Sequence, residues 1–78
     1  MTWNYRVMKK AAGDEVWYEI HEVYYDNSGH PVACTEQPSK PFGENITELA
    51  TDLQYFTEAL EKPPLDYDTL AGLPEKGL

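Results

Sequence analysis

Hydrophobic and polar residues alternate through much of the first 35 positions of the chain, as they do in strands with one buried side. A first strand is predicted over residues 3–9, with Trp3, Tyr5 and Val7 on one side. A second strand, over residues 16–25, is rich in the aromatic and β-branched residues that favour strands. A short third strand includes Val32 and Cys34. On the second strand, the side expected to face the core carries Val16, Tyr18, Ile20 and Tyr24.

Two turn sequences set the pairing that we expect between these strands. Residues 11–14, Ala-Ala-Gly-Asp, predict the first hairpin turn. Residues 26–29, Asp-Asn-Ser-Gly, predict a three-residue loop that pairs Asp26 with His30 and uses Gly29 in a left-handed conformation. The other expected pairs are Val7 with Tyr18, Tyr5 with Ile20, Tyr24 with Val32, and Glu22 with Cys34. This register places both small apolar residues of the third strand on the core side.

The hydrophobic spacing changes after residue 43 to the steps of three and four that are typical of an amphipathic helix. Asn45 can accept a hydrogen bond from the first free N–H groups, and Glu48 can complete a capping box. Because Pro63 and Pro64 cannot continue a helix, we expect it to end near residue 61 or 62. The side predicted to face the sheet carries Ile46, Leu49, Leu53, Phe56 and Leu60.

These elements predict an α+β fold, in which a single C-terminal helix packs on one face of a three-stranded antiparallel β-meander, in the order β-β-β-α. Residues 1–64 are expected to form a single domain, since a chain of 78 residues supports one small core. Residues 65–78 are expected to form a C-terminal tail that is partly docked or disordered. Four apolar residues of this tail could dock as a short turn of helix, whereas residues 74–78 are expected to fray; the four are Leu65, Tyr67, Leu70 and Leu73.

The chain is acidic, with a formal net charge of −8. Residues 1–40 carry six acidic and four basic residues, whereas residues 41–78 carry eight acidic and two basic residues. The resulting field repels nucleic-acid phosphates and attracts basic protein surfaces, although acidic surfaces also serve simply to keep small proteins soluble. No segment is typical of a signal peptide or a membrane span. We therefore expect a cytoplasmic protein with neither a membrane nor a direct nucleic-acid partner.

The sheet face opposite the predicted helix also carries aromatic and apolar side chains. Because one helix covers only one side of a sheet, these side chains must contact a partner, lie beneath the tail, or remain singly exposed. Trp, Tyr, Met and Arg are enriched at the centres of protein interfaces, which favours the first alternative. The predicted partner-binding residues on this face are Arg6, Met8, Trp17, Val23 and Tyr25.

Three carboxylates assigned to the helix, those of Glu44, Glu48 and Asp52, are four residues apart and form a line with intervals of roughly 6 Å. This interval is close to that between adjacent phosphates, so the line could mimic a nucleic-acid backbone and bind a basic protein. The alternative is the solvated face that every amphipathic helix has. We favour this alternative, but keep the three carboxylates as candidate partner-binding residues.

Few residues form a pattern typical of catalysis or metal binding. Glu19 and His21 share one strand face and can contact each other, but we expect the pair to lie exposed on the outer face. Cys34 is predicted to be a core thiol rather than a nucleophile, because it is small, lies on the side expected to be buried, and has no cation near it in the sequence to lower its pKa. His30 lies in a turn, and no His or Cys spacing matches a metal site. We predict no enzymatic activity, no cofactor and no metal site.

Residues 43–49 read Gly-Glu-Asn-Ile-Thr-Glu-Leu and lead into Glu58-Ala59-Leu60. This junction is similar to the glycine, acidic residue, cap and Glu- and Ala-rich helix of HicB-type antitoxins, which belong to a wider group of partial RNase H-like domains. The resemblance implies a core of hairpin-linked strands and a helix, and a toxin-blocking role. The chain lacks the Leu-Pro-Gly-Cys signature of that family and its DNA-binding segment. Residues 17–26 also resemble short uncharacterised bacterial proteins.

We therefore expect a small acidic protein-binding module that is not an enzyme and that blocks or regulates a partner protein, as an antitoxin does. One alternative is a phage-type inhibitor or nucleic-acid mimic that acts on a defence nuclease complex. A second alternative, from another class, is a structural homodimer without a foreign partner.

Overall fold

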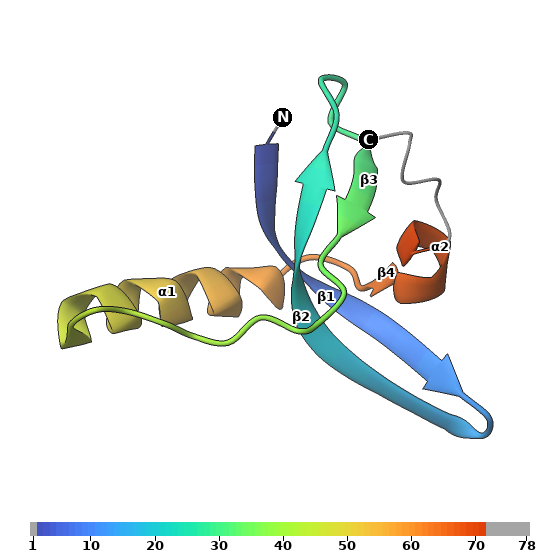
Figure 1. Ribbon diagram of the computed structural model, residues 1–78, viewed down its shortest axis with the longest axis horizontal. Helices are drawn as coiled ribbons and strands as arrows, with labels where there is room; N and C mark the ends of the chain where they lie inside the picture. Colours follow the sequence, from blue (N-terminus) through green and yellow to red (C-terminus); the bar gives the residue numbers. More distant parts are fainter. Residues whose placement is uncertain (1, 72–78) are drawn as a thin grey trace.

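The computed structural model describes residues 2–71, which contain four strands and two helices (Figure 1). The four strands form one curled sheet in the order β3-β2-β1-β4, in which β1, β2 and β3 are antiparallel and β4 is parallel to β1. The elements are β1 (Thr2–Ala12), β2 (Glu15–Tyr25), β3 (Pro31–Cys34), α1 (Ile46–Ala59), β4 (Leu65–Asp66) and α2 (Tyr67–Ala71). The α+β class is confirmed, but the prediction of three purely antiparallel strands and one helix was wrong.

The additional strand and helix come from residues that the sequence analysis assigned to the tail. Pro63 and Pro64 prevent the helix from continuing and favour an extended chain, which brings Leu65 beside Met8. A parallel pair of strands requires a long crossover, which the segment containing α1 provides. The predicted docking residue Leu73 lies outside the described residues. Because β4 pairs only with Met8 and Lys9, the first half of β1 has no neighbouring strand on that side among residues 2–71.

The first hairpin is tighter than the sequence analysis predicted. Its loop is the pair Gly13 and Asp14, with Gly13 at a φ of 62°, so residues 11 and 12 belong to β1 rather than to the turn. Val7 consequently pairs with Ile20 and not with Tyr18. This shift of two residues leaves every side chain on the face that we predicted, because the side-chain period of a strand is two.

The second hairpin has the predicted three-residue loop. The Asp26 backbone N–H donates to the His30 carbonyl at 2.9 Å, and Gly29 has a φ of 84°. A bulge between Tyr24 and Tyr25 then shifts the register, so that Cys34 pairs with Val23 instead of Glu22. Cys34 therefore lies on the sheet face opposite the one that we predicted.

Helix α1 begins at the predicted cap. The Asn45 side chain accepts from the Glu48 backbone N–H at 2.9 Å, whereas the Glu48 carboxylate accepts from the backbone N–H of Glu44 rather than from that of Asn45. A Cβ atom at Gly43 would overlap the backbone of Glu48 and Leu49, so only glycine allows this close approach of the chain to the helix. The helix ends at Ala59, slightly before the predicted position.

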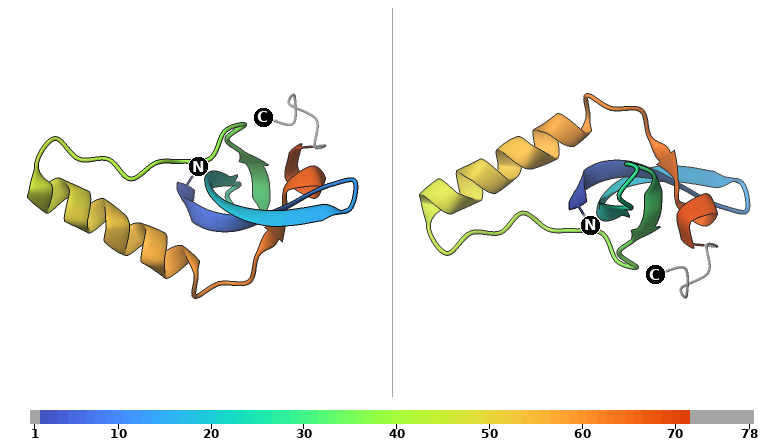
Figure 2. Two further views of the ribbon diagram at one scale, coloured as in Figure 1. Left: turned by 90° about the horizontal axis from the view of Figure 1, so that it is seen from below. Right: turned by 90° about the horizontal axis from the view of Figure 1, so that it is seen from above.

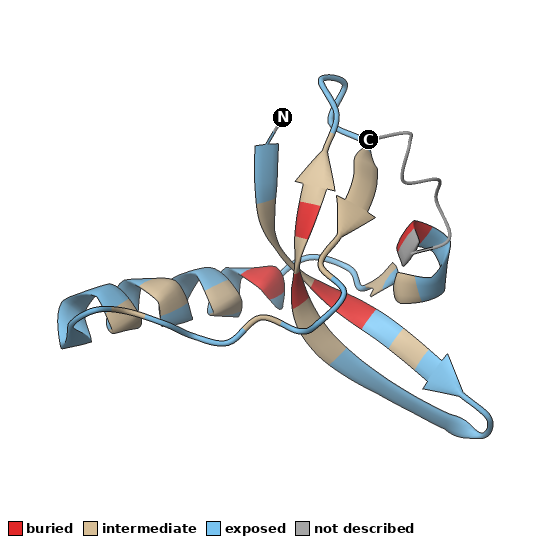
Figure 3. Ribbon diagram, in the orientation of Figure 1, coloured by how far each residue is buried: buried red, intermediate tan, exposed pale blue. Residues whose placement is uncertain are grey.

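The most buried side chains lie on the sheet face that α2 covers. Met8, Val23 and Leu70 form the core cluster, against which Tyr67 and Cys34 pack. Figure 3 shows the buried positions gathered where the strands cross, on α2 and at the C-terminal end of α1. Figure 2 shows that α1 projects away from the sheet and approaches it mainly with that end. Our assignment of the principal core to the side of α1 was therefore wrong.

Candidate functional site: an open aromatic groove and an exposed helix edge

The predicted outer sheet face is closed by the chain itself. Met8 and Val23 are fully buried beneath Leu70 of α2, so neither offers surface to a partner in this structure. The tail alternative applies to this face, and the assignment of Met8 and Val23 to an exposed interface was wrong. The physical reason is that α2, although only five residues long, places two apolar side chains over the centre of the sheet.

The polar residues of the same face are used inside the fold. The Arg6 guanidinium donates to the Tyr25 hydroxyl at 3.0 Å and to the Pro63 carbonyl at 2.8 Å, which ties β1 to the segment before β4. The Tyr25 hydroxyl donates in turn to Asn4 Oδ1 at 2.7 Å. Of the five residues predicted on this face, Trp17 alone remains exposed.

Trp17 borders a polar cluster around Glu19. The Glu19 carboxylate accepts from the Trp17 indole N–H, contacts His21 Nε2 at 2.9 Å, and pairs with Lys10 Nζ at 2.8 Å. The hydrogen bonds from Lys10 and then from His21 lower the pKa of Glu19 from its usual 4.5 to about 2. The predicted contact between Glu19 and His21 is confirmed, but its predicted exposure was wrong, since His21 is fully buried.

His21 has no free ring nitrogen for catalysis in this arrangement. Its Nδ1 contacts the Thr35 carbonyl at 2.9 Å, while its Nε2 contacts Glu19. Tyr67 of α2 lies beside the cluster, with its ring centroid 4.3 Å from Lys10 Nζ and 5.4 Å from the centre of the His21 ring. The cluster is thus a cation held between an aromatic ring and a carboxylate, and it fastens α2 to the sheet.

The remaining candidates for chemistry are Cys34 and the metal-ligating residue types. Cys34 is half-buried against the core cluster, and burial raises the pKa of its thiol. Within residues 2–71, no three His, Cys, Asp or Glu side chains are grouped so that they could hold a metal ion. These residues therefore offer neither an activated thiolate nor a metal-ligand set.

The line of carboxylates predicted on the helix is interrupted. Glu44 precedes the helix, because Asn45 is its cap. Asp52 accepts from the Tyr5 hydroxyl at 2.9 Å and from the Phe42 backbone N–H at 2.8 Å. Burial, followed by this hydrogen bond, raises the pKa of Tyr5 to about 12. Asp52 thus joins the helix to β1 and to the preceding loop, so it does not form a free row with Glu44 and Glu48.

Helix α1 keeps only part of its apolar stripe against the protein. Phe56 packs on Tyr5, with ring centroids 4.4 Å apart, and Ala59 is buried. In contrast, the side chains of Ile46, Leu53 and Leu60 are 79, 46 and 69 % exposed, although all three were predicted to face the sheet. Since they are seven residues apart, they lie along one line of the helix. We call these three residues the exposed helix edge.

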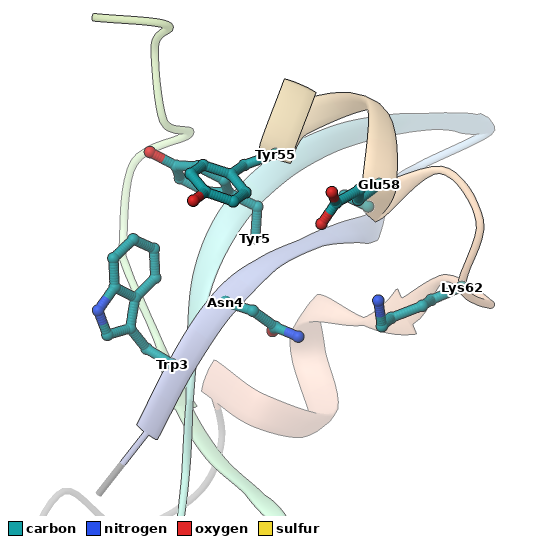
Figure 4. Close-up of a pocket in the computed structure, with 7 residues that line it drawn as sticks. Trp3, Asn4, Tyr5, Tyr55, Glu58 and Lys62 are labelled. Atoms are coloured by element: carbon teal, nitrogen blue, oxygen red, sulfur yellow. The ribbon is translucent and has the colours of Figure 1, made fainter. Parts of the chain in front are cut away.

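A groove opens on the other side of the same helix, between α1 and the unpaired half of β1 (Figure 4). Its volume is about 440 Å³, within the range of small-ligand sites. Figure 4 shows the rings of Trp3, Tyr5 and Tyr55 on one side of the space, with the polar side chains opposite. We call this space the aromatic groove; it is lined by Trp3, Asn4, Tyr5, Tyr55, Glu58, Ala59 and Lys62.

Neither of these surfaces was predicted from the sequence. One signal was available for the groove, because Tyr55 is an aromatic residue that lies off the predicted inward stripe of the helix. The exposed helix edge carried no such signal. Its residues have the spacing of a buried face, and only the position of α1 relative to the sheet leaves them uncovered.

Comparisons of the chain with protein-family models, with curated proteins and with solved structures gave no match. Neither helix within residues 2–71 has the length and apolar character that a membrane crossing requires.

Proposed function

We propose that this protein is a small binding module that docks on another protein through α1 and blocks or regulates that partner. The observation that carries the proposal is the exposed helix edge, on which three large aliphatic side chains lie uncovered in one line. Apolar surface gathered in this way marks interaction sites more often than scattered apolar residues do. An amphipathic helix that presents such a line is a common mode of recognition between proteins.

Charge indicates what kind of partner the helix suits. Residues 44–62 carry five acidic residues and one lysine, so α1 and its flanks are acidic as a whole, although Asp52 is bound to β1 and Glu58 lines the aromatic groove. A partner with an apolar groove and a basic rim complements this surface, and opposite charges at the rim would accelerate association. A second copy of the chain fits less well, because it would bring two acidic helices together. The interrupted row of carboxylates gives no support to nucleic-acid mimicry.

The test replaces two of the three residues of the exposed helix edge and leaves the core unchanged. In the double variant Ile46→Ser with Leu60→Ser, both substituted side chains are mostly exposed. The matched control is Val16→Ser with Tyr18→Ser, which removes exposed apolar side chains from the far end of the first hairpin. Parent, variant and control are used as baits in the native host, and captured proteins are quantified by mass spectrometry and titrated at two ionic strengths.

The expected result is a partner that the parent and the control bind and that the helix variant does not. Added salt should weaken the complex. Equal capture by all three baits would overturn the assignment to α1. Sedimentation at several concentrations supplies the other decisive outcome: a parent that dimerises through α1, and a helix variant that is monomeric, would replace the foreign partner by a second copy of the chain.

A further inference from the structure

We infer that the aromatic groove receives an arginine side chain of the partner, and this inference rests on the proposed function. Trp3 and Tyr55 are the residues whose rings are available for such a contact, since they are 51 and 53 % exposed. The edge of one ring of the Trp3–Tyr5 pair meets the face of the other, with centroids 5.3 Å apart and planes at 79°. Tyr5 is held in place by Phe56 and Asp52, so the inner wall of the groove is fixed before any ligand enters.

Aromatic faces attract cations because of the negative charge above the plane of the ring. The groove adds a carboxylate, that of Glu58, across the space from the rings (Figure 4). A guanidinium suits this arrangement better than an ammonium, because it is planar, weakly hydrated, able to stack on a ring and able to bind a carboxylate with two N–H groups. The net charge of −8 also favours a cationic ligand over an anionic one.

The protein already contains one site of this composition. On the other side of the sheet, Lys10 Nζ lies 4.3 Å from the centre of the Tyr67 ring and 2.8 Å from the Glu19 carboxylate. There the cation comes from the chain itself. The aromatic groove combines rings and a carboxylate in the same way, but neither Trp3, Tyr5 nor Tyr55 has a cation over its ring among the described contacts.

Lys62 is the one basic residue that lines the groove, and its position beside Glu58 allows the charge of the ligand to be tested. It lies four residues after Glu58 and lines the same space, yet the two side chains form no ion pair within the described structure. A cationic ligand would be repelled by Lys62 and attracted by Glu58, whereas an anionic ligand would show the opposite pattern. Variants of these two residues therefore distinguish the sign of the ligand.

The experiment is a titration of the parent protein followed by ¹⁵N NMR spectroscopy. The probes are the blocked tripeptides acetyl-Gly-Arg-Gly-amide, acetyl-Gly-Lys-Gly-amide and acetyl-Gly-Glu-Gly-amide. The two indole N–H signals report on different sites. Trp3 lines the groove, whereas the Trp17 indole N–H donates a hydrogen bond to Glu19 on the opposite sheet face. We expect the arginine peptide to shift the Trp3 signal saturably, the lysine peptide to bind more weakly, and the glutamate peptide to leave it unchanged.

Each variant is expected to weaken, strengthen or leave unchanged the binding of the arginine peptide. Tyr55→Leu should weaken arginine binding by about 2- to 30-fold, the range of a single cation–π contact. Tyr18→Leu, which removes an equally exposed tyrosine elsewhere, should leave binding unchanged. Glu58→Gln should weaken binding and Lys62→Ala should strengthen it. All four positions are exposed, so the variants are expected to fold, and their spectra would confirm this.

Two results would overturn the inference: no saturable shift of the Trp3 signal with the arginine peptide, or weaker arginine binding in Lys62→Ala. The outcome is separable from that of the proposed function. If the partner is lost on substitution of the exposed helix edge while the arginine peptide does not bind, the groove assignment fails and the binding module stands. If the peptide binds and no partner depends on α1, the groove stands as an arginine site and the binding module fails.

Discussion

The two sides of the sheet differ in how completely their helices cover them. Helix α2 has five residues and closes its side, burying Met8 and Val23 and fixing Lys10 against Tyr67. Helix α1 has 14 residues and leaves its side partly open, because it contacts β1 mainly through Phe56 and the residues near its C-terminal end. The length of a helix therefore does not determine how much of a sheet it buries.

The difference has an energetic consequence. On the α2 side, Met8 and Val23 are fully buried beneath Leu70, and burial of apolar surface of this kind stabilises a small domain. On the α1 side, apolar side chains remain in water, where they add little to stability and are available to another molecule. The closed side thus holds the fold together, and the open side is where we place the function.

The largest expected effect comes from breaking the closed side. Met8→Ala removes a fully buried side chain and should lower the free energy of unfolding by about 2–5 kcal/mol. Leu53→Ala, on the open side, removes a side chain that is already half exposed and should cost about 1 kcal/mol or less. Chemical denaturation measures both changes. Equal losses for the two variants would mean that α1 packs more closely than the structure shows.

Several parts of this fold could be predicted because they depend on short-range chemistry. The Asn45 cap and the Asp26–His30 loop each need only a side chain and a few neighbouring backbone groups, and both predictions are confirmed. The choice between sheet faces could not be made in this way. Both faces of β2 carry aromatic and β-branched residues, so the alternation does not indicate which side an additional helix covers.

The docking of the tail as a short turn of helix could be predicted from its apolar residues, but strand β4 could not. Strand β4 has two residues, which is too short for any periodic signal, and its position depends on pairing with Met8 and Lys9. The same applies to the aromatic groove, because Trp3 and Tyr55 are 52 positions apart in the chain and meet only when α1 crosses the end of β1. The spacing of side chains within β1 or within α1 does not predict how the two elements lie relative to each other.

A pH-dependent loss of stability, of intermediate size, is expected at the cluster of Glu19, Lys10 and His21, which holds α2 against the sheet. The pKa of Glu19 is lowered to about 2 in the folded protein from its usual 4.5, so the folded state favours the charged carboxylate. Its stabilising contribution is therefore complete above about pH 4.5 and is lost as the pH falls toward 2. Glu19→Gln should lower stability at neutral pH by about 1–3 kcal/mol, because Lys10 and buried His21 lose a charged acceptor.

Urea denaturation of parent and Glu19→Gln across this acidic range provides the measurement. The two stability curves should converge as the pH falls, because the parent loses the contribution that the variant already lacks. Curves that stay parallel would mean that Glu19 makes no special contact in the folded state. Asp14→Asn, a change to an exposed carboxylate in the first hairpin turn, is the matched control and should change stability at neutral pH by no more than about 0.5 kcal/mol.

The smallest expected effect concerns the open side and decides whether its apolar residues are available for function. Ile46→Ser with Leu60→Ser should change the free energy of unfolding by no more than about 0.5 kcal/mol per site, as is usual for exposed positions without special contacts. Thermal and chemical denaturation of the dilute protein measure this change. A loss of several kcal/mol would show that the exposed helix edge is covered in solution, by a second copy or by the chain itself. Near-neutral stability combined with loss of the partner would instead separate folding from binding, since the two residues would then matter only to the complex.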